Sequence, residues 1–305
     1  MRSSARSRPL HALLAAVLIS ACGLLGAWVA LAAEPRSTSL VSTGPAGGDG
    51  PFEAEFAGAT SDGSQVFFWT EEPLVGGDAN PVRDLYRRGG GETTQITAGP
   101  GGSGAPVGEF GAVTADGGRV FFTTTASLVE ADGDESADVY ERSGETTTLL
   151  STGPAAKNTT EEDAGFAGAS SDGGRVFFET AEQLVKADED ESVDVYERAG
   201  ETTTLLSVGP EGEAGQGPYD AGFAAASADG DRVFFETREA LVGADEDGTT
   251  SDVYERFGGE TAFVSVGGNA TLGATLVAAS TDGTRVLFLT TDKLVAADTD
   301  NAADV

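Results

Sequence analysis

The sequence predicts an all-β fold made of repeated four-stranded antiparallel units, and three observations carry this prediction. The first is an internal repeat whose spacing is 53 to 57 residues. The second is that each repeat alternates short β-branched and aromatic runs with glycine-containing turns. The third is that four such runs fit into each unit. Four-stranded units repeated around an axis make a β-propeller. The repeat is marked by Asp-Gly pairs at Asp62, Asp116, Asp172, Asp229 and Asp282.

The unit that begins at Phe166 shows the expected strands in order. "FAGAS" is a short first strand of small residues, which suits the crowded centre of a ring. "SDGG" supplies turn chemistry, since aspartate and glycine tolerate positive φ. "RVFFET" is a second strand whose unbroken Val-Phe-Phe run indicates burial on both faces. An acidic stretch follows, and then "DVYERAG" and "TTTLLSVG" form the third and fourth strands.

The propeller is predicted over residues 34–305. Its units cover about residues 56–109, 110–165, 166–222, 223–275 and 276–305. "TSLVSTGP", residues 38–45, matches the fourth-strand segment "TTLLSTGP" at 147–154, so we expect it to be a strand that closes the ring. The fifth unit stops at Val305, where a third strand is expected. We therefore expect a truncated fragment that lacks at least one strand.

The repeat motif resembles that of a known family. The pattern S-x-D-G-x-x-V-x-F followed by D-V-Y is similar to the WD40-like (PD40-type) repeat of the TolB-like bacterial propellers. The resemblance covers about residues 38–305 and implies a fold rather than a task, because propellers host many unrelated functions. TolB itself implies a partner-binding role in the periplasm. Nothing in the sequence matches a TolB N-terminal domain, so that role is not carried over.

The first 33 residues predict export. A basic start, a long apolar run and small residues before Glu34 are the layout of a secretory signal peptide. The apolar run over residues 10–33 is long enough to remain as a membrane anchor instead. "ISAC", ending at Cys22, is similar to a lipobox, but the following residues stay apolar. All three interpretations predict an extracellular or cell-envelope location.

Composition excludes several functions. Arg2, Arg6 and Arg8 lie before residue 34, so the remainder has 15 basic residues against 50 acidic ones, a net charge of −35. Such a chain repels phosphate backbones, so we expect no nucleic-acid partner and no membrane contact except through the N-terminal segment. His11 and Cys22 are the only residues of their kinds. Disulfides, histidine bases and zinc sites are therefore not expected after residue 33.

An acidic stretch recurs between the second and third strands of each unit, with the pattern D-x-[DN], three or four residues, then D-[VL]-Y or its beginning. The first unit offers Asp78, Asn80 and Asp84. The others supply the candidate metal ligands Asp132, Asp134, Asp138, Asp188, Asp190, Asp194, Asp245, Asp247, Asp252, Asp298, Asp300 and Asp304.

Three interpretations of these aspartates remain open. They fix turns by accepting bonds from backbone N–H groups, they bind calcium through converging oxygens, or a carboxylate pair is catalytic, as in glycoside hydrolysis. Repetition in every unit argues against catalysis, which needs one asymmetric constellation. We predict no required cofactor, with Ca²⁺ as a candidate, and no catalytic residue in this chain.

An antiparallel meander places the acidic stretches and the variable linkers between units on one end of the sheets, where binding usually resides. The sequence thus favours an exported, non-catalytic module that binds a protein or polysaccharide on that face. The alternative is the propeller part of a secreted hydrolase, a peptidase or a glycosidase or lyase, whose catalytic portion is missing.

Overall fold

The computed structural model describes residues 37–305, except 79, 81, 100–101, 104–107, 156–161, 211–216, 247–249 and 268–271. The chain divides into two units, Met1–Leu40 and Val41–Val305, and every strand described belongs to the second. The predicted signal or anchor, residues 1–33, lies outside the described residues. Within the described part of the chain, no helix is long and apolar enough to cross a membrane.

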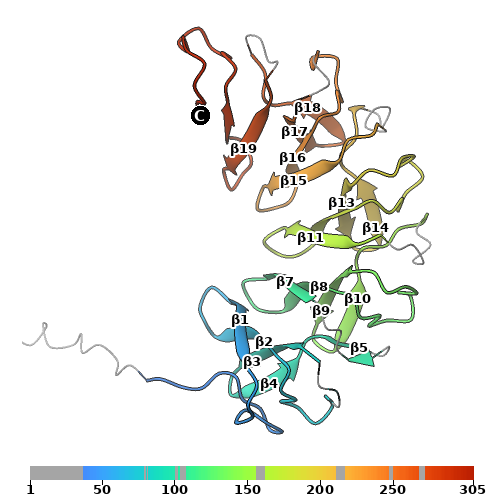
Figure 1. The fold of residues 1–305 in the computed structure, drawn as a ribbon, viewed down its shortest axis with the longest axis vertical. Coiled ribbons are helices and arrows are strands. Elements are labelled where there is room, and N and C mark those ends of the chain that lie inside the picture. The colour runs from blue at the N-terminus through green and yellow to red at the C-terminus, as the bar shows by residue number, and fades with distance from the viewer. Residues whose placement is uncertain are drawn as a thin grey trace, which may run out of the picture. The chain divides into compact units, whose positions relative to one another are not determined.

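The predicted all-β fold of four-stranded blades is confirmed (Figure 1). Four sheets each contain four antiparallel strands in chain order, and the described residues contain no α-helix. The first blade comprises β1 (Ala54–Ala59), β2 (Gln65–Thr70), β3 (Asp84–Gly89) and β4 (Glu92–Gln95). The second comprises β7 (Gly108–Val113), β8 (Arg119–Thr124), β9 (Asp138–Ser143) and β10 (Thr146–Leu149).

The next two blades repeat this plan. The third comprises β11 (Ala164–Ala169), β12 (Arg175–Thr180), β13 (Asp194–Ala199) and β14 (Thr202–Leu205). The fourth comprises β15 (Ala221–Ala226), β16 (Arg232–Thr237), β17 (Asp252–Phe257) and β18 (Glu260–Phe263). A small hairpin, β5 (Ala98–Gly99) and β6 (Gly102–Ser103), lies in the linker between the first and second blades.

The fifth unit forms a two-stranded sheet, β19 (Ala274–Ala279) and β20 (Val286–Thr290). A single bridge joins Thr290 to Asp304, at the point where the third strand of the other blades begins. In the other blades, one face of the sheet packs against the following blade, and the corresponding face of this sheet is exposed. Leu287 is 55 % accessible, whereas its equivalent Phe177 is fully buried. Closure of the ring is not shown and stays a prediction.

The hydrophobic core lies between consecutive blades, which explains the unbroken Val-Phe-Phe runs. In β12, Val176 and Phe178 pack in one cluster with residues of the second blade, including Phe121. Phe177, between them, packs in a different cluster with residues of the fourth blade, including Phe235. Because side chains alternate along a strand, neighbours on both faces are needed to bury three successive apolar residues.

Small residues in the first strands make room for an aromatic ring of the next blade. Phe223 of β15 packs against Phe177 of β12 with ring centroids 5.4 Å apart. A Cβ added at Gly168 would lie 2.9 Å from that same Phe223 ring. The small residues assigned from sequence to the centre of a ring thus have a direct packing reason. Phe56, the equivalent position in the first blade, is 69 % exposed.

Residues 38–45, predicted as a closing strand, form no strand in the structure. Thr43 nonetheless lies where the end of a preceding blade's fourth strand would lie. Its carbonyl accepts bonds from the Arg88 guanidinium, at 3.3 Å, and from the Thr93 hydroxyl. In the next blade, the carbonyl of Ala98 accepts the same pair of bonds, from Arg142 and Thr147. The segment therefore makes the same contact with the first blade that the preceding linker makes with the second.

Candidate functional site

Each blade presents two different ends. Antiparallel pairing of β11 to β14 puts the turns at 170–174 and 200–201 at one end, which we call the turn face together with its equivalents. The loop at 181–193 and the linkers between blades lie at the other end, which we call the loop face. Aspartates recur on both faces, and the structure places them in opposite environments.

On the turn face, each aspartate is part of a closed hydrogen-bond set. Asp172 Oδ1 accepts bonds from the Ser170 hydroxyl at 2.7 Å and from the Gly174 N–H at 2.8 Å. The Ser170 hydroxyl in turn accepts the Arg175 N–H at 3.0 Å. Gly173 has φ +68°, the left-handed conformation that favours glycine. These bonds stabilise the ionised carboxylate and lower the pKa of Asp172.

Three of the arginines that follow these turns, Arg119, Arg175 and Arg232, form ion pairs. Arg119 forks onto Glu141 of the neighbouring strand with contacts of 2.6 and 2.7 Å. Arg175 pairs with Glu197 in its own blade at 2.9 Å and reaches Asp231 of the next blade at 2.8 Å. The turn face thus neutralises part of its own acidic charge.

On the loop face, the first aspartate of the third blade is tied to the buried tyrosine of D-V-Y. The Tyr196 hydroxyl donates to Asp188 Oδ2, and the Tyr196 ring is fully buried against Phe178. Asp188 Oδ1 accepts the N–H of Asp190 at 3.3 Å. The tyrosine ring therefore packs in the core, while its hydroxyl holds the first aspartate of the loop, a contact that sequence reasoning missed.

The second aspartate shapes the loop. Asp190 Oδ1 accepts the Ser192 N–H at 2.7 Å, and the Asp190 carbonyl accepts a bond from the Gln183 side chain at 2.6 Å. Asp190 Oδ2 is buried and has no hydrogen-bond partner. One oxygen of this carboxylate thus fixes the turn, and the other is not used by the protein.

The third aspartate begins β13 and is 4 % exposed. Asp194 Oδ1 accepts a bond from the Ser207 hydroxyl, which itself accepts the Val195 N–H at 3.0 Å. Asp194 Oδ2 is buried without a partner. Sequence reasoning missed Ser207, although a signal was present. A serine or threonine follows the last aspartate by 13 residues in the pairs Asp84–Thr97, Asp138–Ser151, Asp194–Ser207 and Asp252–Ser265.

The structure brings most predicted ligand sets together. In three sets, carboxylate oxygens lie within 4.8 Å of one another: Asp132, Asp134 and Asp138; Asp188, Asp190 and Asp194; and Asp298, Asp300 and Asp304. In the fourth blade, Asp245 bonds to Tyr254 and Asp252 to Ser265, but Asp247 lies outside the described residues. In the first blade, Asn80 stands at the middle position and accepts the Val82 N–H at 3.0 Å.

Burial makes two of the loop-face carboxyls weaker acids than usual. It raises the pKa of Asp138 to about 7 and that of Asp194 to about 8, and the nearby carboxylates of the same sets add to the shift. One acid of the following blade also contributes to each raised pKa: Glu182 acts on Asp138, and Glu239 acts on Asp194. The loop face therefore gathers carboxyl groups at the junctions between blades, and the raised pKa of Asp138 and Asp194 means that these groups do not all ionise at neutral pH.

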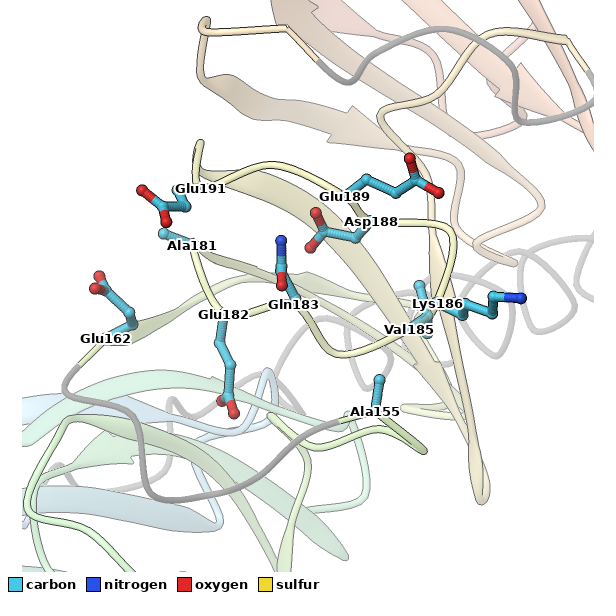
Figure 2. Close-up of a pocket in the computed structure, with 10 residues that line it drawn as sticks. All are labelled: Ala155, Glu162, Ala181, Glu182, Gln183, Val185, Lys186, Asp188, Glu189 and Glu191. Atoms are coloured by element: carbon cyan, nitrogen blue, oxygen red, sulfur yellow. The ribbon is translucent and has the colours of Figure 1, made fainter.

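An acidic hollow of about 680 Å³ opens on the loop face beside the third blade (Figure 2). Among the described residues, Lys186 is the one basic residue on its wall, and its ammonium group points away from Asp188. The hollow holds no histidine or cysteine, since neither occurs after residue 33. Its acidic lining residues are Glu162, Glu182, Asp188, Glu189 and Glu191.

No family model and no curated protein matches this chain. Three solved structures are similar in fold. A structure from work on two prolyl endopeptidases is 17 % identical with TM-score 0.44, over 75 % of this chain and 30 % of its own. The β-propeller domain of the Trilobed protease from Pyrococcus furiosus is 14 % identical with TM-score 0.39, over 69 % of this chain and 53 % of its own. The acylaminoacyl peptidase of Pyrococcus horikoshii is 13 % identical with TM-score 0.39, over 77 % of this chain and 31 % of its own.

The chain thus spans between about a third and about half of the length of these structures. At such identities, the likeness shows the fold. All three are peptidases or part of one, and this finding contradicts the interpretation of the chain as a non-catalytic binding or scaffold module. It agrees better with the alternative, the propeller part of a hydrolase.

Proposed function

We propose that this chain is the propeller part of an exported hydrolase, and that its loop face receives basic peptide substrates for a catalytic portion outside these 305 residues. The acidic hollow is the observation that carries the proposal. The export signal in residues 1–33 and the relation to TolB-like repeats belong to the same proposal, supported by the sequence patterns described above.

The lining of the hollow favours a cationic ligand. Five carboxylates surround it, and Lys186 extends away from Asp188 (Figure 2). A lysine or arginine side chain entering there exchanges hydration for several opposite charges, whereas a neutral polysaccharide gains no such attraction. The net charge of −35 after residue 33 also attracts cationic peptides over longer distances and speeds their association. The hollow therefore suits a peptidase better than a glycosidase.

The rigid blades and their repeated carboxylates also support a binding role for this chain and a catalytic role for another part of the protein. The strands are held by buried cores on both faces, so they form a rigid support for the loops. The recurring carboxylates repeat from blade to blade, whereas a hydrolytic centre needs one asymmetric set of groups. We therefore expect the purified chain of 305 residues to bind basic peptides without cleaving them.

The first experiment tests the hydrolase. The native protein, precipitated by antibody from the cells that make it, should cleave a fluorogenic peptide library, with cleavage concentrated near lysine and arginine. Absence of peptide cleavage, or cleavage of polysaccharides alone, contradicts a basic-peptide hydrolase.

The second experiment tests the hollow. The triple variant E162Q/E189Q/E191Q removes three of the lining charges, and we expect it to weaken binding of a lysine-rich fluorescent peptide by roughly tenfold at low salt. The matched control E145Q/E201Q/E260Q removes three exposed glutamates on the turn face. Because both variants change the net charge equally, equal weakening in the two would contradict a role for the hollow.

A further inference from the structure

We propose that Asp188, Asp190 and Asp194 bind one divalent cation of the calcium type at the junction of the third and fourth blades. This cation makes the docking of the third and fourth blades depend on it. Asp188 also lines the acidic hollow, so the cation lies at the edge of the proposed substrate site.

The first argument is convergence. One carboxylate oxygen from each of Asp188, Asp190 and Asp194 lies within 4.8 Å of the other two. Calcium holds its oxygen ligands at about 2.3–2.6 Å, so two ligands of one ion are at most about 5 Å apart. The three oxygens therefore already have the spacing of ligands around a single ion, and waters can complete a shell of six to eight.

The second argument is that two carboxylate oxygens of this set are buried and unused. Asp190 Oδ2 and Asp194 Oδ2 accept no hydrogen bond, and Asp194 is 4 % exposed. A buried carboxylate oxygen without a partner is strongly unfavourable, because neither water nor the protein replaces its hydration. Such an atom, on a residue whose carboxylate group converges with two others, indicates a missing positive partner.

The third argument is that the protein supplies no such partner. Among the described residues, the ion pairs involve other carboxylates, and none reaches Asp188, Asp190 or Asp194. From the next blade, another acid, Glu239, lies close enough to Asp194 to act on it electrostatically. A cation is the partner that would relieve the mutual repulsion of all four groups.

The hydrogen bonds of the loop do not replace the cation. Asp188 and Asp190 each use Oδ1 to fix the backbone, as the turn-fixing interpretation requires. Asp194 uses Oδ1 for Ser207. Since these bonds leave Oδ2 of Asp190 and Asp194 unoccupied, turn fixing and cation binding use different oxygens of these two residues and occur together. Both oxygens of Asp188 already accept bonds, so Asp188 shares one of them with the cation.

The location connects the cation to blade docking. The Ser192 hydroxyl donates to the Gly217 carbonyl at 3.0 Å, and the Val193 N–H donates to Asp220 at 3.0 Å, both in the linker to the fourth blade. The Ala221 N–H at the start of β15 donates to the Val193 carbonyl at 2.7 Å. A cation that fixes residues 188–194 therefore also fixes the contact with the next blade.

The test uses the full chain, stripped with EDTA and dialysed at constant ionic strength. We expect about 5 mM CaCl₂ to raise the Tm by about 5 °C, given affinities of roughly 10⁻⁴–10⁻³ M for calcium sites of extracellular modules. The variant D190N should lose most of this rise. Asparagine is nearly isosteric and keeps the turn-fixing Oδ1, as Asn80 does in the first blade.

The control is E189Q, which removes one charge from the same exposed stretch without touching the three proposed ligands. It should keep the wild-type rise in Tm, and isothermal titration should show the same number of bound calcium ions. The proposal is overturned if calcium leaves the wild-type Tm unchanged. It is equally overturned if D190N keeps the full rise, because the cation then acts as a general counter-ion.

Discussion

Asp172 and Asp194 are the same residue type in the same blade, and they lie in opposite electrostatic environments. Each accepts a bond from a serine hydroxyl that also accepts a backbone N–H, Ser170 on the turn face and Ser207 on the loop face. Asp172 is exposed and has a lowered pKa, whereas burial raises the pKa of Asp194 to about 8.

The difference shows that one local motif can serve two purposes. On the turn face, water and nearby arginines stabilise the carboxylate, so the motif needs no further partner and serves only to fix the turn. On the loop face, the next blade covers the carboxylate and brings Glu239 rather than a base. The same serine–aspartate unit then has an unused oxygen and becomes a candidate ligand.

The largest expected effect comes from the two serines. Ser207→Ala should destabilise the protein by about 2–3 kcal/mol, because the buried Val195 N–H and Asp194 Oδ1 lose their partner together. Ser170→Ala should cost about 1 kcal/mol, because Asp172, unlike Asp194, is exposed, so its carboxylate keeps the Gly174 N–H and can bind water in place of the buried Ser170 hydroxyl. Urea unfolding of both variants measures the difference. Equal losses would show that burial does not distinguish the two faces.

The next effect concerns charge removal without metal. In EDTA, Asp190→Asn should stabilise the protein by about 1 kcal/mol, because it removes repulsion among buried carboxylates. Asp172→Asn should instead lower the Tm slightly, because Asp172 is well hydrogen-bonded and lies near Arg119. Thermal melts of the two variants beside the wild type check the signs. If Asp172→Asn raised the Tm, or Asp190→Asn lowered it, the two faces would not differ electrostatically as described.

The smallest effect is the response to acid. The pKa of Asp172 and Asp229 is lowered by hydrogen bonds in the turns, and that of Asp282 falls to about 2. A lowered folded pKa gives stability that is present above the unfolded value of about 3.8 and is lost as pH falls toward about 2. D172N/D229N should therefore flatten the Tm profile between about pH 4 and 2. An unchanged slope there would contradict the turn-face assignment.

The sequence was sufficient to predict the repeated blades. The unbroken Val-Phe-Phe runs, the Asp-Gly turns and the 53–57-residue period follow from local patterns, which the sheets confirm. It also identified the three aspartates of each loop. Their environment was not predictable, because Ser207 is 13 residues from Asp194 and Glu239 is 45 residues away on another blade. Burial and pairing arise only when the blades pack.

The residues 38–45 illustrate the same limit. Their match to a fourth-strand sequence predicted a strand, but residues 38–45 form none in the structure. The match did locate one contact correctly: the Thr43 carbonyl accepts bonds from Arg88 and Thr93 of the first blade. Sequence similarity thus located a contact rather than a strand, because strand formation also needs a neighbouring strand to pair with.

The most direct test of the account is a calcium titration followed by NMR of the aspartate side-chain carboxyl carbons. The account predicts that the signals of Asp190 and Asp194 shift and saturate with calcium, while those of Asp172 and Asp229 stay in place. Equal, non-saturating shifts on both faces, or unmoved signals from Asp190 and Asp194, would contradict it.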